Sequence, residues 1–245
     1  MCRQFTYLIS FIWVVAVATS VAPAADPGLV GWWKFDGDGL DSSGNGHNGA
    51  LQGNPQWVAG KMGGALDFDG DDNVSVAGVQ LPTSAFTIAL WFNPLSALSS
   101  GSTRQDLLYW QVGNGRPHVT FNRSGTGEIG LWPNVGGDLN GPSTTTRSWT
   151  AGAWYHVAGT FDGADFKIYV NGKLENTVNH PGTHADASDL LIGSRTNQRN
   201  YFRGKIDDVR LYNIALTESK ILAAMEGSGG YPSAFGPKPA DGALY

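Results

Sequence analysis

The stretch WYHVAGTFDGADFKIYVNGKLENT, residues 154–177, decides the fold class of this chain. Its three runs of aromatic and β-branched residues are separated by two dipeptides, Asp162-Gly163 and Asn171-Gly172. Both dipeptides favour the positive φ angles found in tight turns between antiparallel strands. The stretch therefore predicts three consecutive strands joined as two hairpins.

Runs of the same kind continue along the chain and are punctuated by 34 glycines. Residues 86–91 carry apolar side chains on both faces, which is typical of a strand buried in a sandwich. The expected strands are 29–35, 65–68, 74–77, 85–92, 107–111, 118–122, 128–132, 154–161, 166–170, 174–178, 190–192 and 205–212. Short strands at this spacing, with almost no helical periodicity, predict an all-β fold of two antiparallel sheets packed face to face.

One short helix is expected near the end of the chain. Thr217 can cap it, and Glu218 suits the positive end of the helix dipole. Ile221, Leu222 and Met225 would then share one apolar face.

Residues 1–24 have the pattern of a secretory signal peptide. Arg3 precedes an apolar run over 5–21, and Ala22-Pro23-Ala24 offers small residues at a cleavage site. The alternative is a membrane anchor, because the run is marginally long enough to span a bilayer. We expect cleavage after Ala24, a secreted or cell-surface protein, and no membrane span in the mature chain.

The remaining sequence divides into a domain over 25–227 and a tail over 228–245. The tail is rich in Gly and Pro and has no periodicity, which predicts a linker that leads to a further domain.

Composition limits the classes of partner and stabilising element. Cys2 is the only cysteine and lies inside the signal, so the mature chain has no disulfide and no thiolate metal ligand. Loss of residues 1–24 removes Arg3 and leaves 15 basic and 21 acidic residues, a net charge of −6. Nucleic acid is therefore not expected as a partner, because its binding depends on neutralising phosphates with Lys and Arg.

Five segments, in order, resemble one known family: GLVGWWKFDGDGLDSSGNGHNGAL (28–51), GGALDFDGDDNVSV (63–76), FTIALWFNP (86–94), the hairpin stretch at 154–177 and GKIDDVRLYNIALTESKI (204–221). Together they are similar to the concanavalin A-like, laminin-G-like jelly-roll domains of secreted bacterial proteins, over about residues 28–226. The resemblance implies a two-sheet jelly roll, often with one structural calcium ion. It also implies an adhesion or carbohydrate-binding module, commonly attached to an enzyme. The fold alone does not transfer an activity.

The loop FDGDGLDSSGNGHNGAL, residues 35–51, has the composition of a calcium loop. Calcium takes six to eight oxygen ligands from carboxylates, amides and backbone carbonyls. Asp36 and Asp41 are the candidate carboxylates, and Asn45 and the backbone around His47 are candidate carbonyl donors. The alternative is a metal-free turn, in which the Asp and Asn side chains accept hydrogen bonds from nearby backbone N–H groups.

A further carboxylate is expected from the last strand. Simple alternation places Asp207 on the same face as Val209 and Leu211, and a bare carboxylate on an apolar face needs a partner or an ion. The first and last strands are neighbours in this family, which would bring Asp207 to the loop. Asp208 is expected to be solvated or paired with Arg210.

A second acidic stretch at 67–72 begins like a helix-loop-helix calcium loop. The pattern then fails, because Asp72 stands where glycine is needed and Gly78 where a bidentate Glu belongs. We interpret this stretch as a turn between strands.

Catalysis is not expected. Glycoside hydrolases need two carboxyl groups that flank the scissile bond. The four glutamates, Glu128, Glu175, Glu218 and Glu226, are well separated in sequence, and other catalytic motifs are missing.

A non-catalytic module that binds a carbohydrate or an extracellular protein is the preferred interpretation, and a structural spacer is the alternative. Trp110, Trp132 and Trp149 are candidate exposed aromatic platforms. The segment SRTNQRNYFRG, 194–204, offers Arg195, Arg199 and Tyr201 as ligand contacts, because it combines polar and aromatic side chains in an expected loop.

Overall fold

The structure, a computed structural model, describes residues 26–111, 118–121, 125–132, 140–183, 188–195 and 199–227, and only the backbone of 111 and 118–121. The expected signal peptide (1–24) and linker (228–245) lie outside the described residues. Within the part of the chain that is described, no helix has both the length and the apolar character needed to cross a bilayer.

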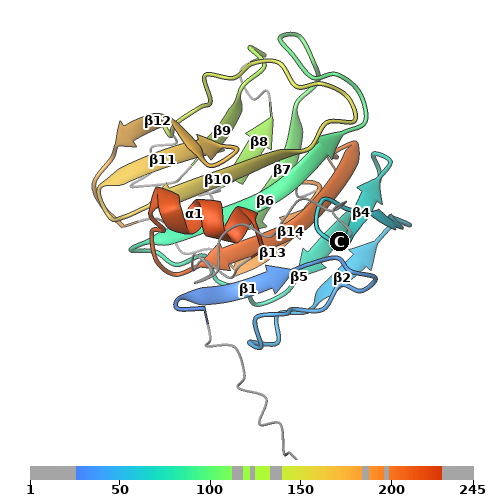
Figure 1. Cartoon of the computed structure of the whole chain (residues 1–245), viewed down its shortest axis with the longest axis horizontal. Coiled ribbons are helices and arrows are strands. Elements are labelled where there is room, and N and C mark those ends of the chain that lie inside the picture. The colour runs from blue at the N-terminus through green and yellow to red at the C-terminus, as the bar shows by residue number, and fades with distance from the viewer. Residues whose placement is uncertain are drawn as a thin grey trace, which may run out of the picture.

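The fold is the expected sandwich of two antiparallel sheets (Figure 1). Sheet A has the spatial order β12 (Lys173–Asn179), β11 (Asp165–Val170), β10 (Tyr155–Phe161), β6 (Phe86–Pro94), β14 (Gly204–Tyr212), β4 (Gly64–Phe68) and β3 (Gln56–Ala59), with β1 (Leu29–Trp33) also paired to β14. Sheet B has the order β2 (Gly49–Gln52), β5 (Asn73–Val76), β13 (Ser188–Ile192), β7 (Gln105–Gln111), β8 (His118–Phe121) and β9 (Ile129–Trp132).

Both predicted hairpins are confirmed. β10 pairs with β11 and β11 with β12, each antiparallel. Asn171 and Gly172 have φ angles of 50° and 77°, the left-handed values that a two-residue hairpin turn needs.

Each of the twelve expected strands overlaps one strand of the structure, and β2 and β3 were missed. Both missed strands have only four residues, none of them fully buried, and half or more of those residues are exposed. They lie at the edges of the two sheets, where burial does not impose an apolar alternation on the sequence.

The core lies between the sheets, and a second, smaller apolar cluster lies outside sheet A. Alternate residues of β6, among them Ile88 and Leu90, point into the core. α1 (Glu218–Met225) lies across the opposite face of sheet A (Figure 1) and packs Ile221 against Ala89 and Ala158. Leu222 is 38% exposed, so the predicted apolar face of this helix is only partly correct.

Strand β14 occupies the centre of sheet A and connects the two ends of the domain. It pairs with β6 along one side, and with β4 and β1 along the other. The first and last strands are therefore neighbours, as the sequence indicated.

Candidate functional site

The carboxylate of Asp41 closes the loop at 35–51 by hydrogen bonding. Its Oδ1 accepts the backbone N–H groups of Trp32 (3.0 Å) and Ser43 (2.9 Å). Its Oδ2 accepts the Ser43 hydroxyl (2.8 Å) and the backbone N–H of His47 (3.0 Å). Burial alone would raise the pKa of Asp41, but these bonds outweigh it and hold the pKa below its usual value. Four donors directed at one carboxylate fit the metal-free turn, and they leave little room for a cation on the same oxygens.

The other expected ligands of this loop attach it to neighbouring strands. Asp36 Oδ1 accepts the backbone N–H of Gly64 in β4 (2.6 Å). The Asn45 side-chain amide donates to the Val30 carbonyl in β1 (3.0 Å). The backbone carbonyl of His47 accepts the indole N–H of Trp33 (2.7 Å).

Asp207 lies on the outer face of sheet A, so the prediction from simple alternation was wrong. Ile206, Val209 and Leu211 all belong to the core, a spacing that strict alternation cannot give. Asp208 has a φ of 51°, and the pairing with β6 shifts register between Asp207 and Arg210. This bulge inserts one extra residue after Asp207, so Val209 and Leu211 return to the face of Ile206 and Asp207 is left on the opposite face.

The turn between β3 and β4 covers Asp207 completely. Asp207 Oδ2 accepts the backbone N–H groups of Lys61 (2.7 Å) and Met62 (2.9 Å), whereas the buried Oδ1 has no hydrogen-bond partner. Burial first, and then the charges of Asp208 and Asp36, raise the pKa of Asp207 to about 7 against the bonds that lower it. The carboxylate therefore sits close to Asp36 but serves a different turn.

Asp208 pairs with Arg210, which is one of the two arrangements predicted from the sequence. Asp208 Oδ2 lies 3.1 Å from Arg210 Nη2, and both side chains are almost fully buried. The indole N–H of Trp32 donates to Asp208 Oδ1, and the guanidinium carbon of Arg210 lies 4.4 Å from the Trp32 ring centroid. Trp32 thus connects the loop at Asp41 to the last strand.

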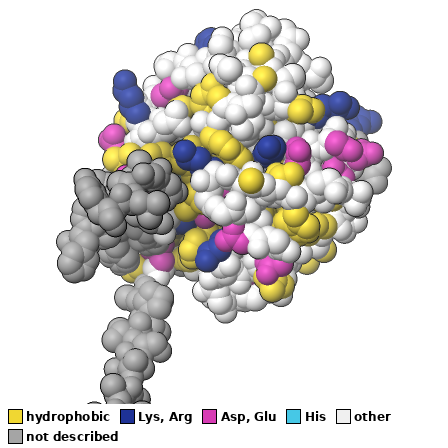
Figure 2. All heavy atoms as spheres, turned by 45° about the vertical axis from the view of Figure 1, so that its right-hand side comes forward, with side chains coloured by type: hydrophobic (Ala, Val, Ile, Leu, Met, Phe, Trp, Pro, Cys, Tyr) yellow, Lys and Arg dark blue, Asp and Glu magenta, His cyan; other side chains and the backbone are white. Residues whose placement is uncertain are grey.

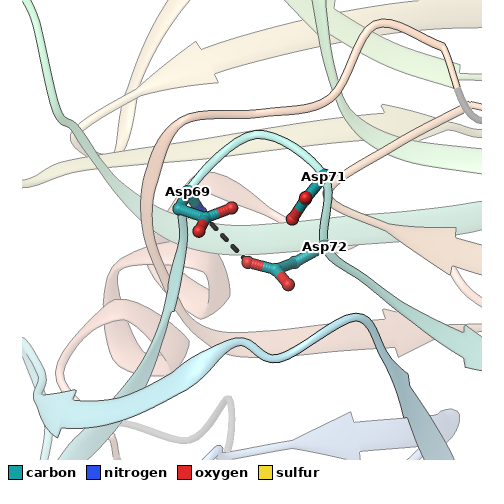
Figure 3. A group of neighbouring side chains, drawn as sticks. All are labelled: Asp69, Asp71 and Asp72. Carbon is teal, nitrogen blue, oxygen red and sulfur yellow. Dashed lines mark hydrogen bonds between the residues drawn. The ribbon is translucent and has the colours of Figure 1, made fainter.

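One group of carboxylates in the described part of the chain is arranged in a way that could hold a metal ion. Asp69, Asp71 and Asp72 follow β4 and have ligand atoms within 4.8 Å of one another (Figure 3). Asp72 is buried and accepts the backbone N–H groups of Asn54 (2.6 Å) and Asp69 (3.1 Å), while Asp69 and Asp71 are exposed. We call these three residues the acidic turn. The interpretation of this stretch as a turn between strands is confirmed. The sequence pattern did not indicate that its three carboxylates lie close together.

Trp110 and Trp149 are not exposed platforms. Each side chain is only 1% exposed, because both lie in the core between the sheets. In β7 the core-facing positions include Leu108 and Trp110, and Trp110 pairs with Leu190 of β13. Tyr109 lies on the opposite face of sheet B from Trp110, but it too is only 1% exposed.

Strand register places the remaining tryptophan candidate in line with Tyr109. Trp132 pairs with His118, and His118 pairs with Tyr109, so positions 132, 118 and 109 share one row across sheet B. Ile129 and Leu131 point into the core, which leaves the half-buried Trp132 on the outer face. The guanidinium carbon of Arg195 lies 5.5 Å from the Tyr109 ring centroid. Two separately predicted ligand contacts, Trp132 and Arg195, therefore belong to one surface.

The expected loop that carries Arg195, Arg199 and Tyr201 is firmly attached to β7. Arg195 N–H donates to the Arg199 carbonyl (3.0 Å). The Asn200 side-chain amide donates to the buried Asp106 (2.8 Å), which also pairs with Arg104 (2.8 Å). These bonds join Arg195 to Arg199 and attach Asn200 to β7.

The same loop meets the acidic turn. Burial, followed by the charges of Asp71 and Asp72, raises the pKa of Tyr201. A Cβ on Gly70 would lie 2.5 Å from Arg203 Nε, so the Arg203 side chain packs against the glycine of this turn. Figure 2 shows acidic and basic side chains interspersed over one face of the molecule, without a large region of one sign.

We call this region the sheet B surface: Trp132, Arg195, Arg199, Tyr201, Arg203 and the exposed Asp71, with the buried Tyr109 beneath Arg195. Arg203, Asp71 and the buried Tyr109 were not among the residues predicted for this surface from the sequence. Alternation along β7 could have separated Tyr109 from Trp110, but the register that aligns it with Trp132 is not visible locally.

The chain belongs to the concanavalin A-like lectin/glucanases superfamily, because a laminin-G-type family model of that superfamily matches residues 68–222. Pappalysin-1 of Mus musculus is 28% identical over 173 residues, covering 62% of this chain and 10% of the relative. Pappalysin-1 of Homo sapiens is 25% identical over 177 residues, again covering 10% of that protein. The chain thus spans about a tenth of the length of these relatives.

Solved structures with the same fold are mainly binding domains. Domain 4 of AbnA, an extracellular arabinanase of Geobacillus stearothermophilus solved with arabinotriose, has a TM-score of 0.66 and 21% identity, and the match covers 81% of this chain and 98% of that one. The binding domain of Paraclostridial Mosquitocidal Protein 1 has a TM-score of 0.64 and 19% identity, over 82% and 52% of the two chains. The botulinum neurotoxin serotype G binding domain has a TM-score of 0.59 and 13% identity, over 80% and 50%.

Replacement of Asp41 tests whether hydrogen bonds close its loop. Asp41→Ala removes the acceptor of four bonds and should lower the free energy of unfolding by about 2–3 kcal/mol. Asp38→Ala is the matched control, because Asp38 is exposed and accepts one bond, from Leu40 N–H at 3.1 Å. Denaturant unfolding with excess chelator measures both. A wild-type loop that needs calcium would make the chelator itself as damaging as Asp41→Ala.

Asp207 and His156 should give opposite pH dependences of stability. The pKa of Asp207 is raised from 3.8 to about 7, so its contribution is full below 3.8 and is lost as pH rises through 7. Burial, with the nearby charge of Arg210, lowers the pKa of His156 from 6.5 to about 3, so its contribution is full above 6.5 and is lost as pH falls toward 3. Between about pH 4 and 6.5 the two groups change the free energy of unfolding with opposite slopes, so their pH dependences cancel.

Asp207→Asn removes the pH dependence that comes from Asp207 and leaves that of His156. Its stability should fall with decreasing pH below 6.5, relative to wild type, by up to about 1.4 kcal/mol per pH unit. At pH 8 it should be more stable than wild type, because no buried charge remains at this position. Unfolding free energies from pH 4 to 8, in metal-free buffer, measure both effects. Parallel curves for the two proteins would contradict the assignment.

Proposed function

We propose that this domain is a secreted, non-catalytic module that binds carbohydrate on the sheet B surface. The observation that carries the proposal is the half-buried Trp132, which lies on the same face of sheet B as Arg195, the residue packed on the buried Tyr109 ring of the same row. Sugars dock with their C–H faces on aromatic rings, while polar side chains bond the hydroxyl groups around the ring. Arg199, Tyr201 and Asp71 supply such groups at the same surface.

The rigidity of this surface supports binding. Asn200 and Arg203 are bonded to β7 through Asp106 and Gln105, whose Oε1 accepts the Arg203 N–H (2.9 Å). A ligand therefore meets side chains already in place and loses less free energy in ordering them. Binding of arabinotriose by the similar arabinanase domain makes a short extracellular oligosaccharide the first ligand to try.

The structural roles of the glutamates support a non-catalytic domain. Glu128 is buried and pairs with Arg147 at 2.8 Å. Glu175 accepts the backbone N–H groups of Thr145 (2.8 Å) and Thr146 (2.9 Å) and so holds one loop. A glycosidase needs two carboxyl groups facing one bond, one of them able to give up a proton, and these two are committed to other contacts.

A protein ligand is the second candidate, and it is favoured by the toxin binding domains among the similar folds. A spacer role would leave the sheet B surface without any ligand. In the experiment below, capture of a protein ligand would indicate the first alternative, and the absence of any ligand would indicate the second.

Calcium as a structural ion stays a prediction. Its placement at Asp36, Asp41, Asn45, His47 and Asp207 is opposed by the four hydrogen bonds of Asp41 and by the separate turn that holds Asp207. The carboxylates most open to an ion are those of the acidic turn, since Asp69 and Asp71 are exposed and lie close to Asp72. Oxygen-rich clusters of this kind suit calcium better than softer metals.

Calcium titration by calorimetry of the chelator-treated chain decides between the two placements. We expect any heat of binding to disappear in Asp69→Asn/Asp71→Asn and to persist in Asp41→Asn. Binding that survives the double substitution but is lost in Asp41→Asn would return the ion to the loop at 35–51.

Substitutions on the two sheets test the carbohydrate proposal. Trp132→Ala and Arg195→Ala should each weaken arabinotriose binding about tenfold or more, which corresponds to about 1.4 kcal/mol. Trp57→Ala is the matched control: Trp57 is 41% exposed but lies on β3 of sheet A, so its loss should leave affinity unchanged. Calorimetry against arabinotriose and a panel of plant and bacterial oligosaccharides gives the affinities. Equal losses in Trp57→Ala, or silence across the panel with capture of a protein ligand, would overturn the proposal.

A further inference from the structure

Four buried polar atoms on the outer face of sheet A have no hydrogen-bond partner: Trp91 Nε1, His156 Nδ1, Asp207 Oδ1 and Arg210 Nη1. Their side chains are at most 6% exposed. A buried polar atom without a partner costs about 1–3 kcal/mol, so four on adjacent strands require a physical explanation.

Strand register places these four residues together. His156 of β10 and Asp207 of β14 pair with Trp91 of β6 from its two sides. Arg210 pairs with Ala89, two residues from Trp91 on the same face. The Trp91 and His156 rings are 5.2 Å apart, and the charge of Arg210 acts on His156. The four groups therefore form one patch of the sheet.

This patch is covered by other parts of the chain. The backbone of Lys61 and Met62 bonds Asp207 from above, and Lys61 Nζ lies 5.0 Å from the Trp91 ring centroid. A Cβ on Gly227, just after α1, would lie 2.6 Å from Met62 Cε, so the end of the helix meets the same turn. The four atoms are thus enclosed between the sheet, the β3–β4 turn and the helix end.

The chemistry of the four atoms selects the ligand. The indole N–H of Trp91 and the guanidinium N–H of Arg210 can only donate. Asp207 Oδ1, and His156 Nδ1 in a neutral imidazole protonated at Nε2, accept. A metal ion would face two donors, and an anion would face a carboxylate. A water molecule has two acceptor sites and two hydrogens, which is the complementary set.

We propose that Trp91, His156, Asp207 and Arg210 enclose an internal water site, of one molecule or a short chain, that hydrogen-bonds β10, β6 and β14 together beneath the β3–β4 turn. Buried waters of this kind make about three bonds to protein groups that would otherwise be unsatisfied. The site is independent of the sheet B surface and of sugar binding.

A crystal structure of the full chain at about 1.5 Å resolution tests the site directly. We expect an ordered water within about 2.7–3.2 Å of Trp91 Nε1, with a second bond to at least one of the other three groups. A dry patch, with Trp91 bonded directly to Asp207 or left without a partner, would overturn the proposal.

Thermal unfolding of two variants gives an independent result. If a water accepts the indole N–H, Trp91→Phe loses a satisfied bond and should lower the melting temperature by several degrees, about as much as Trp32→Phe. Trp32 is the control because its indole donates directly to Asp208. A donor that was truly unsatisfied would give a Trp91→Phe protein at least as stable as wild type. That result contradicts the water site even if both variants fold well.

Discussion

The whole sandwich depends on burying the charged centre of β14. This strand lies between β6 on one side and β4 and β1 on the other, and Asp207, Asp208 and Arg210 are all inaccessible to solvent. A buried charge is tolerated only when it is paired or hydrogen-bonded. Asp208 and Arg210 pair with each other, and their further partner Trp32 and the partners of Asp207, Lys61 and Met62, come from the first part of the domain, so these bonds hold its two ends together.

Two loops are organised by this requirement. Trp32 donates its indole N–H to Asp208 and its backbone N–H to Asp41, so the first loop is attached to the last strand. Lys61 and Met62 present their amides to Asp207, which fixes the β3–β4 turn. The Asp and Gly residues at 35–51 thus serve chain closure, with hydrogen bonds in the place where the sequence suggested an ion. We propose that the buried polar groups of sheet A are structural, whereas the sheet B surface binds the ligand.

The sequence predicted the fold well because hairpin turns and apolar runs are local signals. It failed where a feature depends on one residue or on pairing at long range. The bulge at Asp208 reverses the face of Asp207, and nothing in IDDVRLY indicates a positive φ. Trp110 and Tyr109 are adjacent aromatic residues, and only their neighbours in β8 and β13 decide which one faces the core. Trp132 and the segment at 194–204 were both proposed from composition, and register explains why they share a surface.

Mapping of backbone and indole N–H signals by NMR during titration with a bound oligosaccharide tests this division between the sheets most directly. We expect the chemical shifts of the Trp132 indole N–H and of the Arg195 and Tyr201 amides to change, while those of the Trp32 and Trp91 indole N–H groups stay the same. Movement concentrated at Trp91 and the β3–β4 turn, with Trp132 unaffected, would contradict it.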